Sequence, residues 1–200
     1  MNEKPILFNS EMVNAILSGR KTQTRRIMKV QPQVTEQRLR ELGAWQDGFN
    51  LSQQVNAAFQ AGFIDVSCPL GKPGDQLWVR ETWNKHGGLL TYRADHDWIE
   101  EMRKATVCPA KWVPSIHMPR WASRINLLIT GVRVERLNDI SEQDARAEGV
   151  KAWRGPAEEL VGGKLAFFEL WDSIYGQKEG ENWQANPWVW VINFERMEAK

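Results

Sequence analysis

The first thirty residues alternate between apolar and polar positions in a way that predicts a strand, a helix and a second strand. The run KPILF, at residues 4–8, is a short apolar stretch typical of a strand. Asn9 then offers an N-cap, the apolar residues between 12 and 17 fall on one helical stripe, and Gly19 supplies the left-handed stop. The β-branched residues of TQTRRI, at 22–27, predict a strand directly after that helix.

Period-two alternation predicts most of the remaining strands. In QLWVRETW, at 76–83, successive residues alternate between two faces, as in a strand with one buried side. The segments LLTYR, at 89–93, and INLLITGVRVERL, at 125–137, predict two more strands, with Gly131 as the expected bulge in the longer one. PWVWVINFERM, at 187–197, alternates in the same way and predicts the final strand.

Two helices are expected in the second half of the chain. SEQD, at 141–144, resembles a capping box and opens a helix that ends at Gly149. A start near Pro156, an apolar stripe over 165–174 and Gly176 just past its end predict the longest helix.

Other segments lack clear periodicity. Residues 30–73 are rich in Gln, Asn, Gly and Ala, with only a short helix expected near 35–42, and this predicts an insertion or lid. Residues 109–119 form a proline-punctuated loop, with one turn of helix expected at 120–124 and a turn or two at 97–105. The helices are too irregularly spaced for a repeated βαβ pattern. The pattern favours an α+β fold in which helices flank a small, mixed, partly closed β-barrel.

Composition supports one domain and limits its partners. The 200 residues are 42% hydrophobic and 26% charged, as expected for a single domain over 1–200. The net charge is only +1, so an anionic partner has to meet a local basic patch. Two distant cysteines and an N-terminus unlike a signal peptide predict a cytoplasmic protein with reduced thiols. No apolar run reaches the ~20 residues of a membrane span, and we expect no metal or cofactor.

Residues 20–29 concentrate positive charge at the first helix–strand junction. Tight turns of this kind expose backbone amides beside the cations and suit phosphate or carboxylate ligands. Strand alternation would place Thr22, Thr24 and Arg26 on one face. A solvated charged surface is the alternative interpretation. The run contains five cations and no carboxylate: Arg20, Lys21, Arg25, Arg26 and Lys29.

A second basic group alternates with tryptophan. Such alternation suits a stacked base with its phosphate, although most of the eleven tryptophans are expected to serve packing. The group comprises Lys111, Arg120, Arg124, Arg133 and Arg136, with Trp112 and Trp121.

Glu148 is an acid in an unfavourable place. It lies in the last turn of its predicted helix, just before Gly149, where the helix dipole disfavours a negative charge. We therefore expect a cationic partner for Glu148 in the basic run at 20–29.

Several blocks of the sequence together resemble the ASCH family of the PUA-like superfamily, in its longer, Trp-rich form common in phages and prophages. The blocks are G-x-K-T-x-T-x-R from Gly19 to Arg26, the GD-x-LWVRETW strand at 74–83, PSIHMPRWASRI at 114–125, DARAEGV at 144–150, FFELWDSIYG at 167–176 and NPWVWV at 186–191. The resemblance implies a small PUA-like β-barrel with a cleft beside the first helix, and an association with RNA and modified nucleosides.

Some compact ASCH proteins hydrolyse the amide of N4-acetylcytidine with a lysine, a threonine and a glutamate. The resemblance assigns these roles here to Lys21, Thr24 and Glu148. In that scheme the surrounding arginines lower the pKa of Lys21, Thr24 is the nucleophile, and Arg26 stabilises an oxyanion. Lys21 and Thr24 meet only if the helix–strand turn extends through Lys21.

Three functions remain open. The first is binding of RNA, other single-stranded nucleic acid or a modified cytosine nucleoside in a basic cleft. The second is hydrolysis of N4-acylated cytosine nucleosides, and the third is a phage accessory factor that binds proteins through exposed tryptophans. The oligomeric state is open. The expected binding residues are Arg20, Thr22, Arg25, Arg26, Arg80, Glu81, Trp83, Arg120, Trp121 and Arg124.

Overall fold

The computed structural model describes residues 2–86, 88–96, 111–151, 153–154 and 160–198. Its strands are β1 (Glu3–Leu7), β2 (Gln23–Ile27), β3 (Gln76–Arg80), β4 (Trp83–His86), β5 (Leu89–Tyr92), β6 (Asn126–Arg136), β7 (Trp153–Arg154), β8 (Leu160–Val161) and β9 (Trp188–Arg196). Its α-helices are α1 (Ser10–Leu17), α2 (Glu36–Glu41), α3 (Leu51–Gln60), α5 (Glu142–Ala147) and α6 (Gly163–Tyr175). Short 3₁₀ turns are η1 (Arg93–His96), η2 (Ser115–His117), η3 (Arg120–Ala122) and η4 (Leu137–Asp139).

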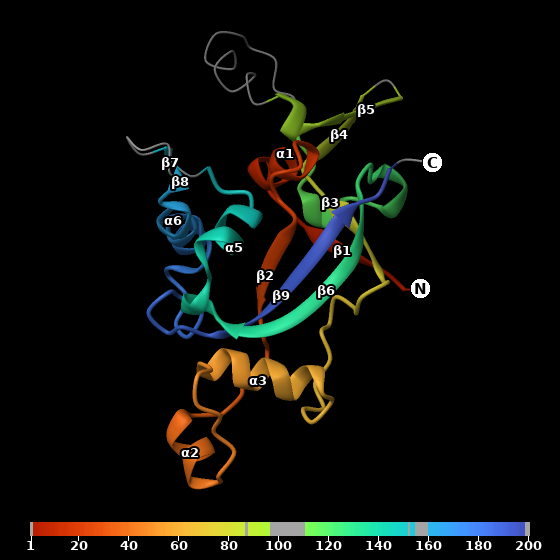
Figure 1. Ribbon diagram of the computed structural model, residues 1–200. Helices are drawn as coiled ribbons and strands as arrows, with labels where there is room; N and C mark the ends of the chain where they lie inside the picture. The colour runs from red at the N-terminus through yellow and green to blue at the C-terminus, as the bar shows by residue number, and fades with distance from the viewer. Residues whose placement is uncertain (1, 87, 97–110, 152, 155–159, 199–200) are drawn as a thin grey trace.

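A curved five-stranded sheet forms the centre of the molecule, in the order β1-β3-β6-β9-β2. β1 pairs with β3 in parallel, whereas the other neighbours are antiparallel. The long strand β6 bends around this sheet, and α5 and α6 lie to one side of it (Figure 1). At one end the two edge strands meet, because the Arg26 guanidinium on β2 donates a hydrogen bond to Leu7 O on β1 at 3.1 Å. The mixed α+β fold predicted from the sequence is confirmed.

Strand β9 is buried on both faces, which explains its apolar sequence. Trp188, Trp190, Ile192 and Phe194 enter the main core, while Val189 and Val191 pack beneath α5 and α6. This is the alternation expected from the sequence. Burial of these large side chains contributes about 1.5–3 kcal/mol each.

Local signals at the element ends are also confirmed. The side chain of Asn9 caps α1 by accepting from Met12 N at 2.9 Å, and Gly19 after the helix has φ +75°. Ser141 caps α5 through its hydroxyl. The register of β6 against β9 shifts between Ile129 and Gly131, so the bulge expected at the glycine is present.

The longest helix begins later than the sequence pattern predicts. α6 starts at Gly163, after Gly162 in the left-handed region, rather than near Pro156. The hairpin of β7 and β8 precedes it, and two-residue strands are too short to show periodicity. Pro156 and the helical turns expected at 97–105 lie outside the described residues.

Helix α3, within the segment 30–73, was not predicted. It has a capping box between Asn50 and Gln53, and an apolar pair at Val55 and Phe59 that packs against the core. Because Gln and Ala outnumber large apolar residues in this stretch, the helical period was obscured. Whether 30–73 is an insertion or lid stays a prediction, but α3 itself packs firmly on the sheet.

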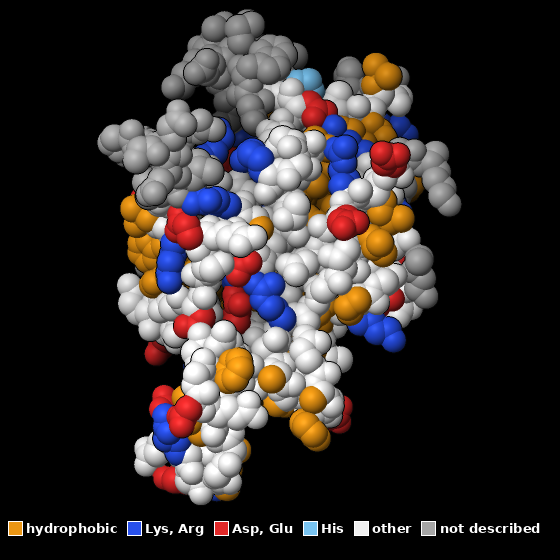
Figure 2. All heavy atoms as spheres, viewed as in Figure 1, with side chains coloured by type: hydrophobic (Ala, Val, Ile, Leu, Met, Phe, Trp, Pro, Cys, Tyr) orange, Lys and Arg blue, Asp and Glu red, His pale blue; other side chains and the backbone are white. Residues whose placement is uncertain are grey.

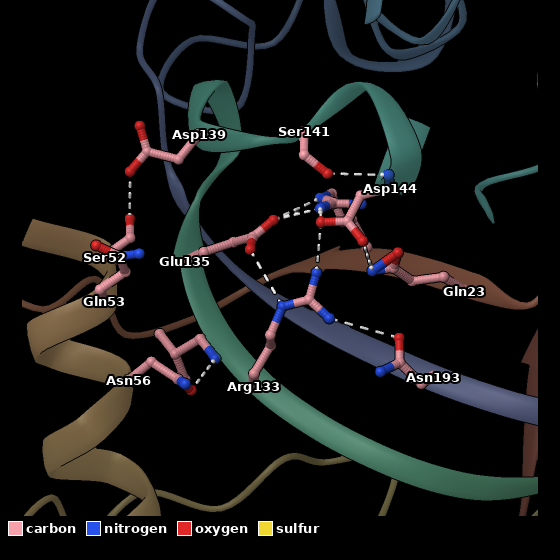
Figure 3. Close-up of polar contacts among 12 residues, drawn as sticks. Gln23, Ser52, Gln53, Asn56, Arg133, Glu135, Asp139, Ser141, Asp144 and Asn193 are labelled. Carbon is pink, nitrogen blue, oxygen red and sulfur yellow. Dashed lines mark hydrogen bonds and ion pairs between the residues drawn. The ribbon is translucent and has the colours of Figure 1, made fainter. Parts of the chain in front are cut away.

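The polar face of α3 covers a strand edge. Beyond its pairing with β3, the outer edge of β6 has free backbone groups, which are usually covered or charged in native proteins. Ser52 Oγ accepts from Arg136 N at 2.7 Å, Asn56 Oδ1 accepts from Val134 N at 3.1 Å, and Gln60 Nε2 donates to Val132 O at 2.8 Å. One polar stripe of a helix thus replaces a neighbouring strand, and Figure 3 shows two of its members, Ser52 and Asn56, on the helix beside β6.

We expect Ser52→Ala to lower the free energy of unfolding by about 1–3 kcal/mol, since Arg136 N and the Asp139 carboxylate both lose their partner. Ser173→Ala, on the exposed side of α6, serves as the control and should change it by less than about 0.5 kcal/mol. Urea unfolding followed by circular dichroism measures both. Equal effects would show that the helix stripe does not secure the edge of β6.

Candidate functional site

Glu148 lies between two buried cations. Lys21 Nζ donates to Glu148 Oε2 at 2.7 Å and to the backbone oxygen of Glu148 at 2.8 Å. Arg25 Nη1 donates to the other carboxylate oxygen, Oε1, at 3.0 Å. Both cationic side chains are fully buried, and that of Glu148 is 3% exposed. The cationic partner expected for Glu148 is therefore present in the basic run.

Two turns bring these residues together. After α1 the amides of Arg20 and Lys21 both bond to Ala15 O, so the turn extends through Lys21 before β2 begins at Gln23. This satisfies the geometric condition stated from the sequence. Opposite it, Glu148 is the C-cap residue of α5, and its backbone forms a β-bridge with Lys21.

Gly149 permits the close approach of the two turns. Its φ is +91°, and a Cβ at this position would lie 2.7 Å from Ala15 Cβ and 2.8 Å from Lys21 Cβ. A side chain here would push the turn at Lys21 away from Glu148.

A wider ionic network extends from Arg25 away from Glu148. Arg25 also pairs with Glu135 and, at 3.6 Å, with Asp144, and Arg133 bonds to both of these acids. The Gln23 amide completes the group. In the orientation that satisfies both of its ends, it donates to Asp144 Oδ1 at 3.1 Å and accepts from Arg133 Nη2 at 2.9 Å. Figure 3 shows the members converging from β2, β6 and α5. Three cations (Lys21, Arg25, Arg133) face three carboxylates (Glu135, Asp144, Glu148).

A cavity of about 460 Å³ opens beside this network. Its polar lining includes Thr24, Arg26 and Glu148. A neighbouring cavity of about 480 Å³ shares Glu148 with it and is lined by Arg20 as well. The aromatic walls of the first cavity are Phe8, Phe167, Trp171 and Tyr175.

Thr24 and Arg26 share one face of β2, as predicted. Arg26 Nη1 donates to Thr24 Oγ1 at 2.7 Å, and the guanidinium lies over the Phe8 ring at 5.3 Å. Burial lowers the pKa of Arg26 from its ordinary value. Because the Thr24 oxygen accepts from Arg26, its own proton is free to be donated into the cavity.

Burial is the main influence on Lys21. It lowers the pKa of the amine, the nearby Glu148 carboxylate opposes this, and Arg26 and Arg25 add to the lowering. The expected direction is therefore found, but its largest cause is burial and not the neighbouring arginines. Arg20, the remaining arginine of the basic run, instead donates to Gly149 O at 2.8 Å from an exposed position.

The remaining predicted residues divide between two regions. Thr22 is exposed and joins the site only through its backbone, which bonds to Ala147 O. A second, separate group forms around β3 and β4. Its members are Arg80, Glu81, Trp83, Arg120, Trp121 and Arg124.

The arginines of this second group have partners within the protein. Arg124 forms two hydrogen bonds to the buried carboxylate of Glu81 and a third to Asp95. Burial raises the pKa of Glu81, and Arg124 opposes this. Arg120 pairs with Glu3, so neither arginine is an unneutralised cation.

Arg80 and the two tryptophans of the group play different parts. Arg80 donates to Met118 O and lies over the Trp78 ring at 4.9 Å. Trp83 is buried, whereas Trp121 is 62% exposed and packs edge-on against it. The sequence analysis placed Arg133 and Arg136 in the same basic group as Arg120 and Arg124. In the structure they lie near the C-terminal end of β6, away from those two arginines.

The sequence did not predict the aromatic walls of the cavity or the acids Glu135 and Asp144 of the network. The stripe predicted within 165–174 included Trp171 but not Phe167, and its members Leu165 and Ile174 are exposed. Alternate cations and acids at Arg133 and Glu135 in β6 were the available signal for the network.

Charge is mixed on the surface around the network. Acidic and basic side chains are interspersed on the described part of the face seen in Figure 2. Among the described residues, no group of three or more His, Cys, Asp or Glu side chains is arranged to hold a metal ion. Within the same residues, every helix is too short or too polar to cross a membrane.

Comparison with known proteins gives one similar structure. No protein-family model and no curated protein matches the chain. Among solved structures the chain is similar to a crystal structure of an ASCH domain from Lactobacillus crispatus JV V101. The two share 11% identical residues at a TM-score of 0.39, with 98% of this chain and 79% of that chain covered. At this similarity the function has to be argued from the site itself.

We expect Gly149→Ala to destabilise the protein by about 1–3 kcal/mol more than Gly180→Ala. Both glycines have positive φ, but only at Gly149 does the added methyl meet Ala15 and Lys21. Thermal unfolding measures the difference. If the two variants lose equal stability, the close approach of the turns is not a constraint on the fold.

Glu148→Gln should lower the pKa of Lys21 further, because the carboxylate that raises it is removed while burial remains. NMR titration of the lysine ε-carbon measures this, with Glu181→Gln as a control at an exposed pair. Since folding lowers the pKa of Lys21, stability should rise with pH between that lowered pKa and 10.5, over a wider window in the variant. An unchanged or higher pKa would contradict the pairing.

Proposed function

We propose that the 460 Å³ cavity binds a cytosine-type base, presented by RNA, by another single-stranded nucleic acid or by a modified nucleoside. The observation that carries this proposal is the Glu148 carboxylate, held by Lys21 and Arg25 in the wall of a cavity lined by aromatic rings. The volume is in the range of about 300–1,000 Å³ that small-molecule sites occupy. Aromatic side chains provide the surfaces on which bases stack.

The polar groups complement the edge of cytosine. Cytosine presents an amino donor beside two acceptors, and carboxylates commonly accept from that amino group. Each oxygen of Glu148 uses one of its lone pairs on a cation and retains another for a ligand. Thr24 and Arg26 offer donors on the same cavity. The motif resemblance to the ASCH family supports the same ligand class.

Amide hydrolysis of an N4-acylated cytosine is the second candidate. It is favoured by the lowered pKa of Lys21 and by Thr24 lining the same cavity as Glu148. The Thr24 oxygen would attack the acyl carbon while neutral Lys21 takes its proton, and Arg26 would stabilise the oxyanion. The C–N bond then breaks, the amine leaves with the proton that Lys21 took from Thr24, and a water positioned by the Glu148 carboxylate releases the acyl group from Thr24.

Binding is better supported than hydrolysis because Thr24 and Lys21 already form hydrogen bonds within the protein. Thr24 Oγ1 accepts from Arg26, and Lys21 Nζ donates to Glu148, so in the described structure the base and the nucleophile each face another partner. Binding needs no rearrangement of these pairs. The third candidate, a protein-binding accessory role, has support only from exposed aromatic side chains such as Trp121.

The binding test compares two threonines that are two residues apart. Thr24→Val should weaken binding of cytidine or N4-acetylcytidine by about 3- to 10-fold through loss of one hydrogen bond, whereas exposed Thr22→Val should not. Quenching of tryptophan fluorescence measures this. A single-stranded RNA should bind in the same assay, and more weakly as salt increases. If neither nucleosides nor RNA bind at low salt, the proposal is wrong.

The same variants decide on hydrolysis. Turnover of N4-acetylcytidine, followed by absorbance, should vanish in Thr24→Val and Lys21→Met if the second candidate holds. Binding of the intact nucleoside without any turnover in the parent protein would leave the first function and exclude the second.

A further inference from the structure

Arg26 differs from the three cations of the ionic network in forming no ion pair with an acid among the described residues. Lys21, Arg25 and Arg133 each pair with at least one carboxylate. Arg26 bonds only to neutral acceptors within the described part of the chain, namely Thr24 Oγ1, Arg25 O and Leu7 O. The charged residues that line the 460 Å³ cavity are Arg25, Arg26 and Glu148, so this lining carries one excess positive charge, and Arg25 is already paired with Glu148.

The guanidinium also retains unused donors. An arginine has five N–H groups, of which the three bonds above use two on Nη1 and one on Nη2. The Nε–H and the second N–H of Nη2 have no acceptor among the described residues. Two adjacent N–H groups of this kind match the paired oxygens of a phosphate or carboxylate.

Glu148 is the carboxylate of the cavity lining that acts on Arg26, and it does so without a hydrogen bond to it. Apart from Arg25 and Glu148, the other polar side chains of the cavity are neutral, and the two oxygens of Glu148 already accept from Lys21 and Arg25. Aromatic rings form much of the remaining wall, and one of them, Phe8, lies under the guanidinium. A cation beside apolar walls attracts an anion more strongly than one in open water.

We propose that Arg26 binds an anionic group of the ligand, so that the cavity takes a nucleotide in preference to a neutral nucleoside. This inference rests on the proposed function and specifies its ligand class. The shared chemistry is a phosphate oxygen pair, which a free mononucleotide and a phosphodiester of single-stranded RNA both provide.

The test compares cytidine with 5′-CMP, 3′-CMP and the dinucleotide CpC by isothermal titration calorimetry at low salt. We expect at least one phosphate-bearing ligand to bind about 10-fold or more tighter than cytidine. A gain with 5′-CMP or 3′-CMP identifies a terminal phosphate, whereas a gain confined to CpC identifies the phosphodiester of a polymer. Inorganic phosphate alone serves as the probe for ion binding without a base.

Variants then assign the preference to Arg26. Arg26→Met should reduce the ratio of nucleotide to cytidine affinity to near one, and Arg26→Lys should restore part of it. Arg38→Met, at an exposed arginine of α2 that lines neither cavity, should leave the ratio unchanged. If Arg26→Met does not fold, the ratio in the parent protein and in Arg26→Lys still decides the question.

The two proposals fail in different ways. Equal affinities for cytidine and all three phosphate ligands in the parent protein would overturn the anionic preference and leave base binding intact. A preference that persists in Arg26→Met would also overturn it. Failure of cytidine and every nucleotide to bind would remove the proposed function and this inference together.

Discussion

The buried contact of Glu148 with Lys21 and Arg25 is the constraint around which the rest of the site is arranged. A carboxylate and two cations removed from water are each costly unless they neutralise one another with good geometry. Here Lys21 and Glu148 are 127 positions apart in the chain and still 2.7 Å apart in space. The turn after α1 and the turn after α5 must therefore meet, and Gly149 is the residue that lets them. The position of the cavity between α1 and α6 follows from this meeting.

Stability alone does not account for such a network. Replacing a buried ion pair by apolar side chains of similar volume is often neutral or stabilising. The sheet around it is already well packed, with Trp188 and Ile192 wholly buried in β9. The proposed function offers a better explanation, because Lys21 and Arg25 hold the Glu148 carboxylate in the wall of the cavity. Keeping Lys21 charged while buried is part of the cost of the network, and the protein is therefore predicted to become more stable as the amine loses its proton.

Sequence reasoning succeeded where the cause was local. The helix dipole at the end of α5 disfavours the charge of Glu148, which predicted a cationic partner for it. The basic run after Gly19 supplies that partner, so two local arguments predicted a long-range contact. It failed where the cause was tertiary. The polar stripe of Ser52, Asn56 and Gln60 makes sense only once the free edge of β6 is known. Likewise Arg124, read as a binding residue, has its carboxylate partners brought to it by the fold.

The contrast between the two basic groups separates cations that hold the fold from those that can serve a ligand. Composition counts Arg25, Arg26 and Arg124 alike, but the structure neutralises the first and the third with acids. Within the described part of the chain, Arg26 donates its hydrogen bonds to neutral oxygens and lies over an aromatic ring, at the point where the edge strands of the sheet approach each other. A sheet closed by backbone pairing would have no need of a charged group there. Because a guanidinium joins β1 to β2, the place where the sheet stays open is also the place of the positive charge on which the proposed anion site rests.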